Sequence, residues 1–415
     1  MYQIVAWFLE TRQKESEVPF VIHKLKYLFL KYIFSFQKVI LFLSYSYHKS
    51  IQLILKEREK VSWVVGVDEM AAMIKYISIS LPGAFSVNLT KNPYYNFEYD
   101  FSLSSHNKLF SKIYRLFVGP ILLGRLVTQA DGFFYIWKSR FLMTFIDEGE
   151  YEFTFIKKRS RKLVLFFVGN DIRSPKLAMM MADDRGDEVT SNYYYLTKPN
   201  VLTNDYEKRI EKRVQIAEKC ADLIFTSRID QVSYFTRDTN KFLYFYPDHQ
   251  FYCDRAKFNC VDVCKIVHAP SSPITKGTQL VRSAITRLRK ENYNFEYVEL
   301  QKTANTYVLK ELRTAHIVLN EFYAHVPGVF GVEALANFCA LMTSADEYIE
   351  TDLPAGSNQA WLCTKSYEIY DNLKFLLDNP EQQIKYAEYG YQWALENAAQ
   401  SLSGKKLQKL LESIG

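Results

Sequence analysis

The sequence predicts an α/β protein of two Rossmann-like domains that face a cleft, preceded by amphipathic helical segments. Its 415 residues exceed what a single hydrophobic core usually serves. Both halves alternate short apolar runs with helical patterns, which is typical of parallel sheets covered by helices. Several apolar runs end in glycine and polar residues, as expected of strands that present a binding site at their carboxyl ends.

Composition excludes several classes of protein. Hydrophobic residues make up 48% of the chain and charged residues 24%, which are ordinary globular values and argue against disorder. The net charge of +6 is too small over this length to predict a nucleic-acid partner. The six cysteines form no CxxC pair, so we expect free thiols in a reducing compartment and no metal site. No secretory signal pattern opens the chain, and we expect a cytoplasmic protein.

Residues 1–60 are expected to form an amphipathic N-terminal helical segment. A membrane span over residues 20–47 is disfavoured, because Lys31 and Lys38 would each cost about 2.5 to 3.5 kcal/mol in the hydrocarbon. At helical spacing the polar side chains share a narrow arc opposite a broad apolar face, although Lys26 falls on the apolar side. The polar arc holds Lys24, Lys31, Ser35 and Lys38, and the apolar face holds Leu28, Phe29, Ile33, Phe36, Ile40 and Leu43. This pattern fits a helix in the interface of an anionic membrane and equally an amphipathic helix packed on its own domain.

A second basic and apolar stretch runs from Lys108 to Arg125, where Lys108, Lys112 and Arg115 share one helical face. Gly119-Pro120 is expected to break this helix. Two such segments in one half of the chain favour a peripheral position on the inner face of the cell membrane.

The first α/β domain is expected over residues 61–250. Its predicted strands are 63–67, 84–89, 163–168 and 223–226, its predicted helices are 69–80 and 207–221, and 242–246 is a further apolar run. Because ligands of open α/β sheets bind at the carboxyl ends of strands, residues that follow these strands are site candidates. They are Gly66 after the first strand and Asn170, Asp171 and Arg173 after a later one.

The second α/β domain is expected over residues 251–391, with the junction near 246–260. Its predicted strands are 265–268, 295–300 and 316–319, and its predicted helices are 279–290, 308–314 and one that opens at 333–337. Three more helices are expected at 366–377, 381–391 and 394–401, separated by Asn379-Pro380 and Gly390.

The segment from His325 to Ser344, HVPGVFGVEALANFCALMTS, carries the clearest chemical signal. Gly328 and Gly331 allow the backbone to approach a phosphate, which the positive end of the following helix would face. Glu333 can accept hydrogen bonds from ribose hydroxyls. Glycines before a helix are common in α/β proteins, so the spacing alone also fits an ordinary loop.

This segment resembles the signature of family-4 retaining glycosyltransferases, in which an acidic residue, seven residues and a Glu lead into Ala-Met-Ala-x-Gly-x-Pro-Val. Here Glu333-Ala334-Leu335-Ala336 keeps the centre of that signature. The loop from His268 to Thr278 is similar to a loop of the family whose Lys-Gly pair binds the donor diphosphate. Lys276 and Gly277 match that pair, so the resemblance implies the same role for them. With the segments Ala315–Glu321 and Asp378–Glu381, the resemblance spans roughly residues 205–400 in consistent order.

The resemblance implies the GT-B fold and a retaining, metal-independent transfer of a glycosyl group from a nucleoside-diphosphate sugar, without a cofactor. The acceptor would be a hydroxyl of a glycan or lipid-linked molecule in cell-surface polysaccharide or glycoconjugate synthesis. We expect Lys276, Glu333 and Asp171 to take part in catalysis, and Asn170, Asp171 and Arg173 to meet acceptor or donor. The expected donor-binding residues are Gly66, His268, Lys276, Gly277, His325, Gly328, Val329, Gly331 and Glu333. The first domain would bind the acceptor and the second the nucleotide sugar, and residues 392–415 would form a helix that crosses back to the first domain.

Three positions depart from the family pattern. His325 stands in place of the first acidic residue, and Phe338 and Ala340 replace the usual Gly and Pro. They leave open a catalytically silent GT-B relative that acts as a binding or assembly subunit of a polysaccharide machine. A nucleotide-sugar epimerase or a phosphorylase of the same architecture is a third interpretation. The acidic stretch Asp183–Asp187 lacks the Asp-x-Asp spacing of metal-dependent transferases and is expected to be a solvated loop.

Overall fold

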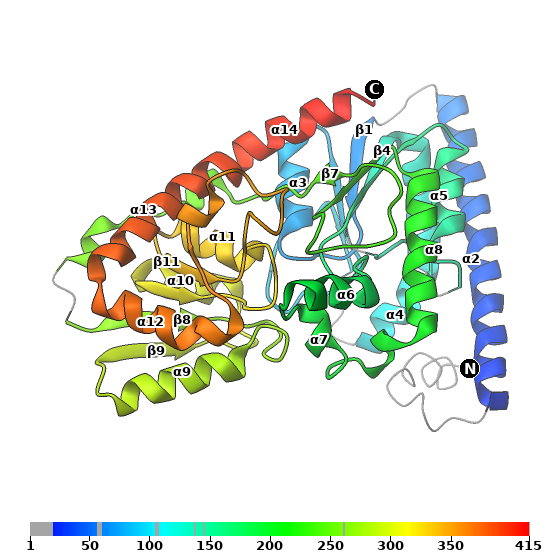
Figure 1. Ribbon diagram of the computed structural model, residues 1–415. Coiled ribbons are helices and arrows are strands. Elements are labelled where there is room, and N and C mark those ends of the chain that lie inside the picture. Colours follow the sequence, from blue (N-terminus) through cyan, green and yellow to red (C-terminus); the bar gives the residue numbers. More distant parts are fainter. Residues whose placement is uncertain are drawn as a thin grey trace. The chain divides into compact units, whose positions relative to one another are not determined.

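The computed structural model describes residues 20–55, 60–103, 108–136, 138–143, 146–259 and 262–414 (Figure 1). The chain divides into two compact units. The first unit comprises Met1–Asn92, Phe97–Leu165 and Ile216–Leu223, and the second comprises Pro93–Asn96, Phe166–Gln215 and Ile224–Gly415.

A seven-stranded sheet has the order β3-β2-β1-β4-β5-β6-β7 among the described residues. Its strands are β1 (Val61–Gly66), β2 (Phe85–Asn88), β3 (Phe101–Ser102), β4 (Ala130–Ile136), β5 (Lys162–Phe166), β6 (Leu223–Thr226) and β7 (Asn240–Lys241). The pairs β1–β2, β1–β4, β2–β3 and β6–β7 are parallel. The helices of this half are α2 (Phe20–Leu55), α3 (Met73–Ser80), α4 (Lys108–Gln129), α5 (Glu150–Lys157), α6 (Pro175–Arg185), α7 (Thr190–Tyr194), η3 (Pro199–Leu202) and α8 (Asn204–Cys220).

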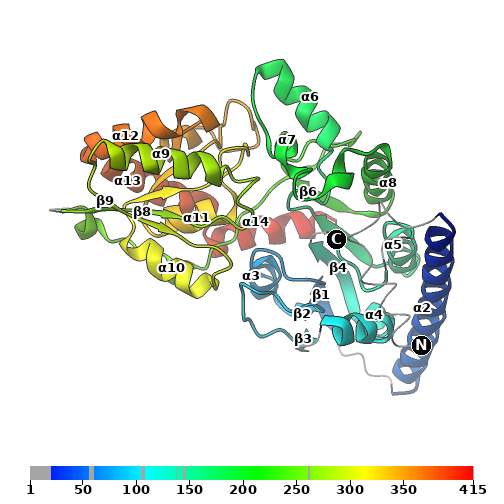
Figure 2. The same ribbon diagram turned by 90° about the horizontal axis from the view of Figure 1, so that it is seen from below.

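A five-stranded parallel sheet has the order β12-β11-β10-β8-β9 and lies in the second unit. Its strands are β8 (Cys264–His268), β9 (Phe295–Glu299), β10 (Ile317–Leu319), β11 (Ala340–Thr343) and β12 (Leu362–Cys363). The helices are η4 (Asp248–Gln250), η5 (Arg255–Phe258), α9 (Thr278–Lys290), α10 (Asn305–Thr314), α11 (Gly328–Ala336), η6 (Ser357–Gln359), η7 (Ser366–Glu368), α12 (Ile369–Asp378), α13 (Pro380–Asn397) and α14 (Gln400–Glu412). One face of the sheet packs on α9 and α12, and α10 lies on the other face (Figure 2). The core of that second face includes residues of α10, α11 and the carboxyl-terminal part of α13.

Two parallel sheets flanked by helices confirm the predicted fold class. The strands of the two sheets come from opposite sides of the expected junction, since β7 ends at Lys241 and β8 begins at Cys264. Residues 260 and 261 of that stretch lie outside the described residues. The run 242–246 forms no strand; Tyr246 instead makes an isolated parallel bridge to Ala399.

Two helices differ from the prediction near the carboxyl end. Helix α11 begins at Gly328 and ends at Ala336, so Glu333 lies in its second turn instead of opening it. Helix α13 runs from Pro380 to Asn397 without a break at Gly390. A Cβ at Gly390 would lie 2.5 Å from Leu335 Cδ2 and 2.8 Å from the Ala360 carbonyl oxygen. This glycine therefore serves the close approach of α13 to α11, and not a helix end.

Helix α4 also continues through Gly119-Pro120, contrary to the prediction. Pro120 has no N–H to donate to the carbonyl oxygen of Leu116, four residues earlier. The side-chain amide of Gln37 donates to that oxygen instead, at 3.1 Å. Because Gln37 on α2 is 1% exposed, its amide replaces the missing helical hydrogen bond inside the protein.

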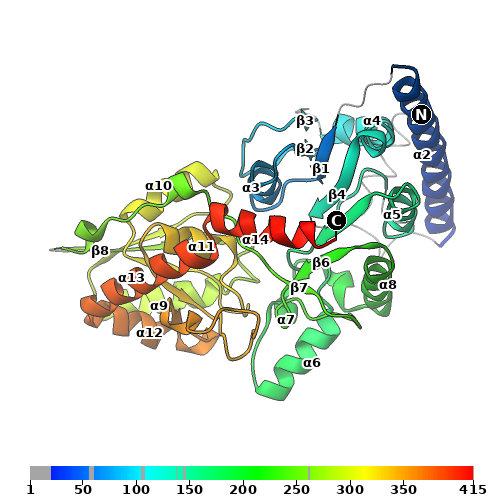
Figure 3. The same ribbon diagram turned by 90° about the horizontal axis from the view of Figure 1, so that it is seen from above.

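Helix α2 packs on its own unit along one face and leaves the opposite face exposed. Phe34, Gln37 and Leu41 are buried, and α2 lies beside α4 and α5 (Figure 3). Lys24, Lys31 and Ser35 are exposed as the helical wheel predicts, but so are Leu28, Phe36 and Leu43 of the expected apolar face. On α4, Arg115 forms an ion pair with Asp68 at 2.9 Å, so its charge is neutralised within the unit. The side chains of Lys26, Lys108 and Lys112 lie outside the described part.

Candidate functional site

Two loops at the carboxyl ends of β8 and β10 form the centre of the candidate site. The two strands pair in parallel, so the loops that follow them, 269–277 and 320–327, leave the same edge of the sheet. Gly277 has φ +76° and is the N-cap of α9. A Cβ at Gly277 would lie 3.4 Å from the Phe322 side chain and 3.5 Å from that of Tyr323, which shows how closely the loops approach.

Lys276 in the first loop forms an ion pair with Glu321 in the second. Burial raises the pKa of the Glu321 carboxyl, and the Lys276 ammonium opposes that rise. A Cβ at Gly328 would lie 2.8 Å from Glu321 Oε1, so the carboxylate rests against the first residue of α11. A phosphate that reached Lys276 would therefore compete with Glu321 for the ammonium.

Glu333 lies on α11 with its carboxyl buried. The side-chain amide of Asn305, the first residue of α10, donates to Glu333 Oε1 at 2.7 Å. Burial raises the pKa of Glu333 to about 7, and the hydrogen bond from Asn305 opposes the rise. The Glu333 carboxyl is thus a buried acceptor between α10 and α11, and its contact with ribose stays a prediction.

Two other glycines among the expected donor-binding residues, Gly331 and Gly66, lie where a side chain would come too close to neighbouring atoms. A Cβ at Gly331 would lie 2.9 Å from both Asn320 Nδ2 and Pro327 Cβ, so only glycine fits. Val329 is half-buried in the first turn of α11. Gly66 ends β1 in the first unit, and a Cβ there would lie 2.9 Å from the Val87 carbonyl oxygen.

His268 is a fully satisfied core residue. Its Nδ1 lies 2.7 Å from the Leu319 carbonyl oxygen, and its Nε2 lies 2.9 Å from Thr278 Oγ1. Since a carbonyl only accepts, Nδ1 carries the proton and Nε2 accepts from the hydroxyl. Burial lowers the pKa of His268 to about 4, so the ring is neutral and links β8 to β10 and α9. Its predicted contact with a donor remains a prediction.

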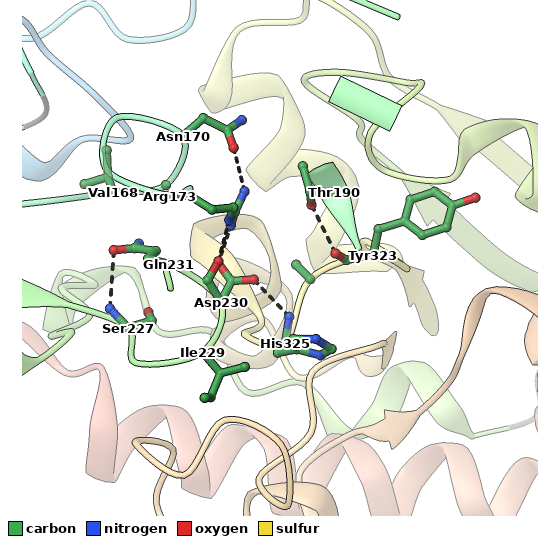
Figure 4. A network of polar contacts seen from close by, with 12 residues as sticks. Val168, Asn170, Arg173, Thr190, Ser227, Ile229, Asp230, Gln231, Tyr323 and His325 are labelled. Atoms are coloured by element: carbon green, nitrogen blue, oxygen red, sulfur yellow. Dashed lines mark hydrogen bonds and ion pairs between the residues drawn. The ribbon is translucent and has the colours of Figure 1, made fainter. Parts of the chain in front are cut away.

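The loop after β5 uses its polar residues for its own structure and for one ion pair. The Asp171 carboxylate is buried and accepts from the Gly169 N–H at 2.8 Å. Arg173 donates to Asn170 Oδ1 at 2.6 Å and to Asp230 Oδ2 at 2.5 Å (Figure 4). Arg173 holds the pKa of Asp230 below its usual value although burial alone would raise it. Asp171 therefore shapes the loop that aims Arg173; a catalytic part for Asp171 stays a prediction.

Asp230 connects this loop to His325. The His325 N–H donates to Asp230 Oδ1 at 3.0 Å, on the side of the carboxylate away from Arg173 (Figure 4). His325 Nε2 lies 3.2 Å from Arg185 Nη2. A guanidinium can only donate, so Nε2 accepts and the ring proton is on Nδ1, which is buried without a hydrogen-bond partner. Burial lowers the pKa of His325, with Asp230 opposing, so the ring is neutral.

A small pocket opens beside these groups in the second unit. It is lined by Arg173, Ala178, Met181, Arg185, Val189, Thr190, Ile229, Asp230, Val232, Tyr323 and His325. His325 lines this pocket, and its Nδ1–H has no hydrogen-bond partner. Asp230 thus links His325 to Arg173, which in turn contacts Asn170. Separately, Glu321 links Lys276 to Gly328.

Four polar residues of this region were absent from the sequence-based site: Asn305, Glu321, Asp230 and Arg185. Glu321 follows β10 and Asp230 follows β6, so the rule that singled out Asn170 also applies to them. Asn305 and Arg185 lie on helices and carry no comparable signal. Within the described ranges, no group of three His, Cys, Asp or Glu side chains lies close enough to hold a metal ion.

Comparison with known proteins gives likenesses of structure. No family model matches the chain, and no curated protein does. A sucrose-phosphate synthase of Thermosynechococcus elongatus is similar with a TM-score of 0.57 and 9% identity, covering 86% of this chain and 99% of its own. HepE of Anabaena, solved with UDP-glucose, has a TM-score of 0.53 and 9% identity over 85% of this chain and 99% of its own. WaaG, a glycosyltransferase involved in lipopolysaccharide biosynthesis, has a TM-score of 0.50 and 11% identity, covering 84% of this chain and 99% of its own. The chain therefore has the GT-B fold of glycosyltransferases.

Proposed function

We propose that the protein is a retaining glycosyltransferase that uses a nucleoside-diphosphate sugar. The observation that carries the proposal is the pairing of a lysine and a buried carboxylate acceptor around the amino end of α11. Lys276 lies beside Gly328 through Glu321, and Glu333 lies one turn further along the helix. Diphosphate and ribose, joined in one molecule, need a cation and an acceptor at such adjacent positions.

The solved relative HepE was crystallised with UDP-glucose, which favours a uridine nucleotide as donor. The acceptor we propose is a hydroxyl of a glycan or of a lipid-linked molecule. We carry the metal-independent reaction over from the family-4 resemblance, in which the ammonium of the Lys-Gly loop offsets diphosphate charge.

In the proposed reaction, the bond between the anomeric carbon and the diphosphate oxygen breaks as the acceptor hydroxyl oxygen binds the same carbon from the same face. The hydroxyl proton passes to the departing diphosphate, so configuration is retained without a dedicated protein base. The Lys276 ammonium leaves Glu321 and pairs with the diphosphate. It stabilises the charge that grows on the diphosphate, an electrostatic effect that is strongest in the transition state. Glu333 holds ribose equally in the ground and transition states.

The test is turnover of a panel of nucleoside-diphosphate sugars, measured as release of the nucleoside diphosphate. Lys276→Ala should lower kcat by about 100-fold or more, whereas Glu333→Gln should chiefly raise KM, since its contact is uniform. Lys265→Ala is a matched control, because Lys265 forms an ion pair with Glu311 at the opposite end of β8. Equal losses in the Lys265 and Lys276 variants would reject the role of Lys276.

The second candidate is a catalytically silent relative, which the neutral ring of His325 favours at a position where the family has an acid. Such a protein would bind the nucleotide through Lys276 and Glu333 and show no turnover with any sugar. Binding without turnover across the full panel would replace the transferase proposal by this one.

A further inference from the structure

Helix α2 is fixed to the first unit by polar contacts along its inner face. Besides Gln37, which donates to the Leu116 carbonyl, Ser44 donates to the Ile121 carbonyl at 2.8 Å. Near its carboxyl end, Gln52 donates to Thr128 Oγ1 at 3.2 Å. These contacts follow α4 for about four helical turns of α2, so the helix lies flat on the unit.

The outer face of α2 is apolar and exposed. Its exposed large hydrophobic residues are Leu25, Tyr27, Leu28, Tyr32, Phe36, Val39, Phe42, Leu43, Tyr47, Leu53 and Ile54. The face continues onto α4, because Phe36 and Phe117 are both nearly half exposed and their ring centroids lie 6.0 Å apart. Tyr114 and Ile121 of α4 are exposed as well. We call this set of exposed side chains the outer apolar face.

A row of lysines runs along one edge of the outer apolar face. Lys24, Lys31 and Lys49 are exposed, and at helical spacing they fall on one side of Leu28, Val39 and Leu43. Helix α2 contains no Asp or Glu. Apolar side chains bordered by cations complement a bilayer with anionic headgroups, where burial and charge attraction act together.

Two other occupants fit the observations less well. Residues Tyr27–Ile54 are long and apolar enough to cross a membrane, but a crossing helix would have to leave α4 and lose the buried contacts of Gln37. A second copy of the chain would bring a second lysine edge against the same face, without acidic residues on α2 to pair with it.

We propose that the outer apolar face of α2 and α4 binds an anionic membrane surface, with α2 lying in the plane of the interface. Its apolar side chains enter the boundary between headgroups and acyl chains, and its lysine edge contacts lipid phosphates. The proposal is independent of the donor site, because it concerns only side chains of the first unit.

The experiment is co-sedimentation of the full chain with vesicles of phosphatidylglycerol and phosphatidylcholine, or of phosphatidylcholine alone. We expect strong binding to the anionic vesicles and weak binding to the neutral ones. Reversal of Lys24, Lys31 and Lys49 to Glu should weaken the partition by at least on the order of 100-fold, since the loss of each lysine alone costs about fivefold. The matched control reverses the exposed Lys208, Lys290 and Lys302, which changes net charge equally.

A second variant, Leu28, Val39 and Leu43 to Ser, removes apolar area and leaves every charge in place. It should also weaken binding to anionic vesicles, while thermal unfolding stays near that of the wild type because the three side chains are exposed. Equal losses in the control reversal, or no binding by the wild type, would overturn the proposal. A dimer that the Ser variant abolishes would identify a second copy as the occupant, and resistance to alkaline extraction would identify a spanning helix.

Discussion

At the residue scale, two of the three departures from the family pattern are matters of packing. Phe338 has φ +59° and follows the end of α11, where its N–H donates to the Leu335 carbonyl at 3.1 Å. Glycine is the usual residue at such a helix end, because the left-handed backbone strains any side chain. Phe338 compensates by packing against Phe258 and Tyr391, with ring centroids 6.1 and 5.8 Å away. Ala340 begins the buried strand β11. Of the three, only His325 lines the pocket.

At position 338, the smaller of two substituted residues should give the more stable protein. Phe338→Ala loses the aromatic contacts and keeps the strained backbone, and should cost about 3 to 5 kcal/mol in the free energy of unfolding. Phe338→Gly loses the same contacts but relaxes the backbone, so it should be about 1 kcal/mol more stable than the Ala variant. Urea unfolding of the three proteins measures both differences. An Ala variant as stable as the Gly variant would contradict the account of strain.

Glu333 predicts a pH dependence of stability. The native state raises its pKa from 4.5 to about 7 and so binds the proton more tightly than the unfolded chain. The stability that this group contributes is therefore present below its ordinary pKa and is lost as the pH rises through about 7. Glu333→Gln keeps the acceptor for Asn305 and does not titrate. Its stability relative to wild type should increase between pH 5 and 8, on the order of 3 kcal/mol.

Glu311→Gln is the control for that series. The ion pair and hydrogen bond from Lys265 lower the pKa of Glu311, so it does not titrate between pH 5 and 8. The stability difference between this variant and the wild type should stay constant over the interval. If the Glu333 variant also showed a constant difference, the carboxyl would have to be less buried than the structure places it.

The sequence allowed Lys276 and Glu333 to be proposed for the site because glycines beside a charged residue, after a strand or at a helix start, are a local signal. Glu321 and Asp230 also follow strands and so carry the same local signal, but their roles as partners of Lys276 and Arg173 depend on which loops meet, and the sequence does not show that. His268 lies at a buried strand end, a position that suits a ligand and a core residue alike, and its donor contact stays a prediction.

At the scale of elements, the sequence predicted the existence of strands and helices better than their ends. A glycine or proline signals a break only if nothing else satisfies the backbone. Pro120 lies inside α4 because Gln37 supplies the lost hydrogen bond, and Gly390 lies inside α13 because Leu335 needs the space. Both reasons are tertiary contacts, and neither can be deduced from the helix's own residues.

Gln37 predicts a coupling between two helices. Gln37→Leu should remove the partner of both the Leu116 carbonyl and the Met143 N–H, at a cost of about 1 to 3 kcal/mol of unfolding free energy for each group. Pro120→Ala restores the backbone N–H, so the same Gln37 substitution should cost clearly less in that background. A double-mutant cycle by urea unfolding measures the difference. Additive costs would show that Gln37 does not replace the helical hydrogen bond.

At the scale of the whole molecule, the class of two parallel sheets was predictable because alternating strands and helices are a local pattern repeated along the chain. The assignment of residues to the two units could not be predicted in the same way. Residues 93–96 belong to the second unit and 216–223 to the first, although their neighbours in sequence belong to the other. Such exchanges depend on contacts between distant segments, which periodicity does not reveal. The expected return of residues 392–415 to the first domain stays a prediction.

We propose that the loops around the amino end of α11 bind a nucleoside-diphosphate sugar. A crystal structure of the protein with UDP tests it most directly. We expect the ribose hydroxyls to donate to Glu333 and the diphosphate to lie at Gly328 and Lys276, with the Lys276–Glu321 ion pair broken. A nucleotide bound elsewhere, or an intact ion pair beside bound UDP, would contradict it.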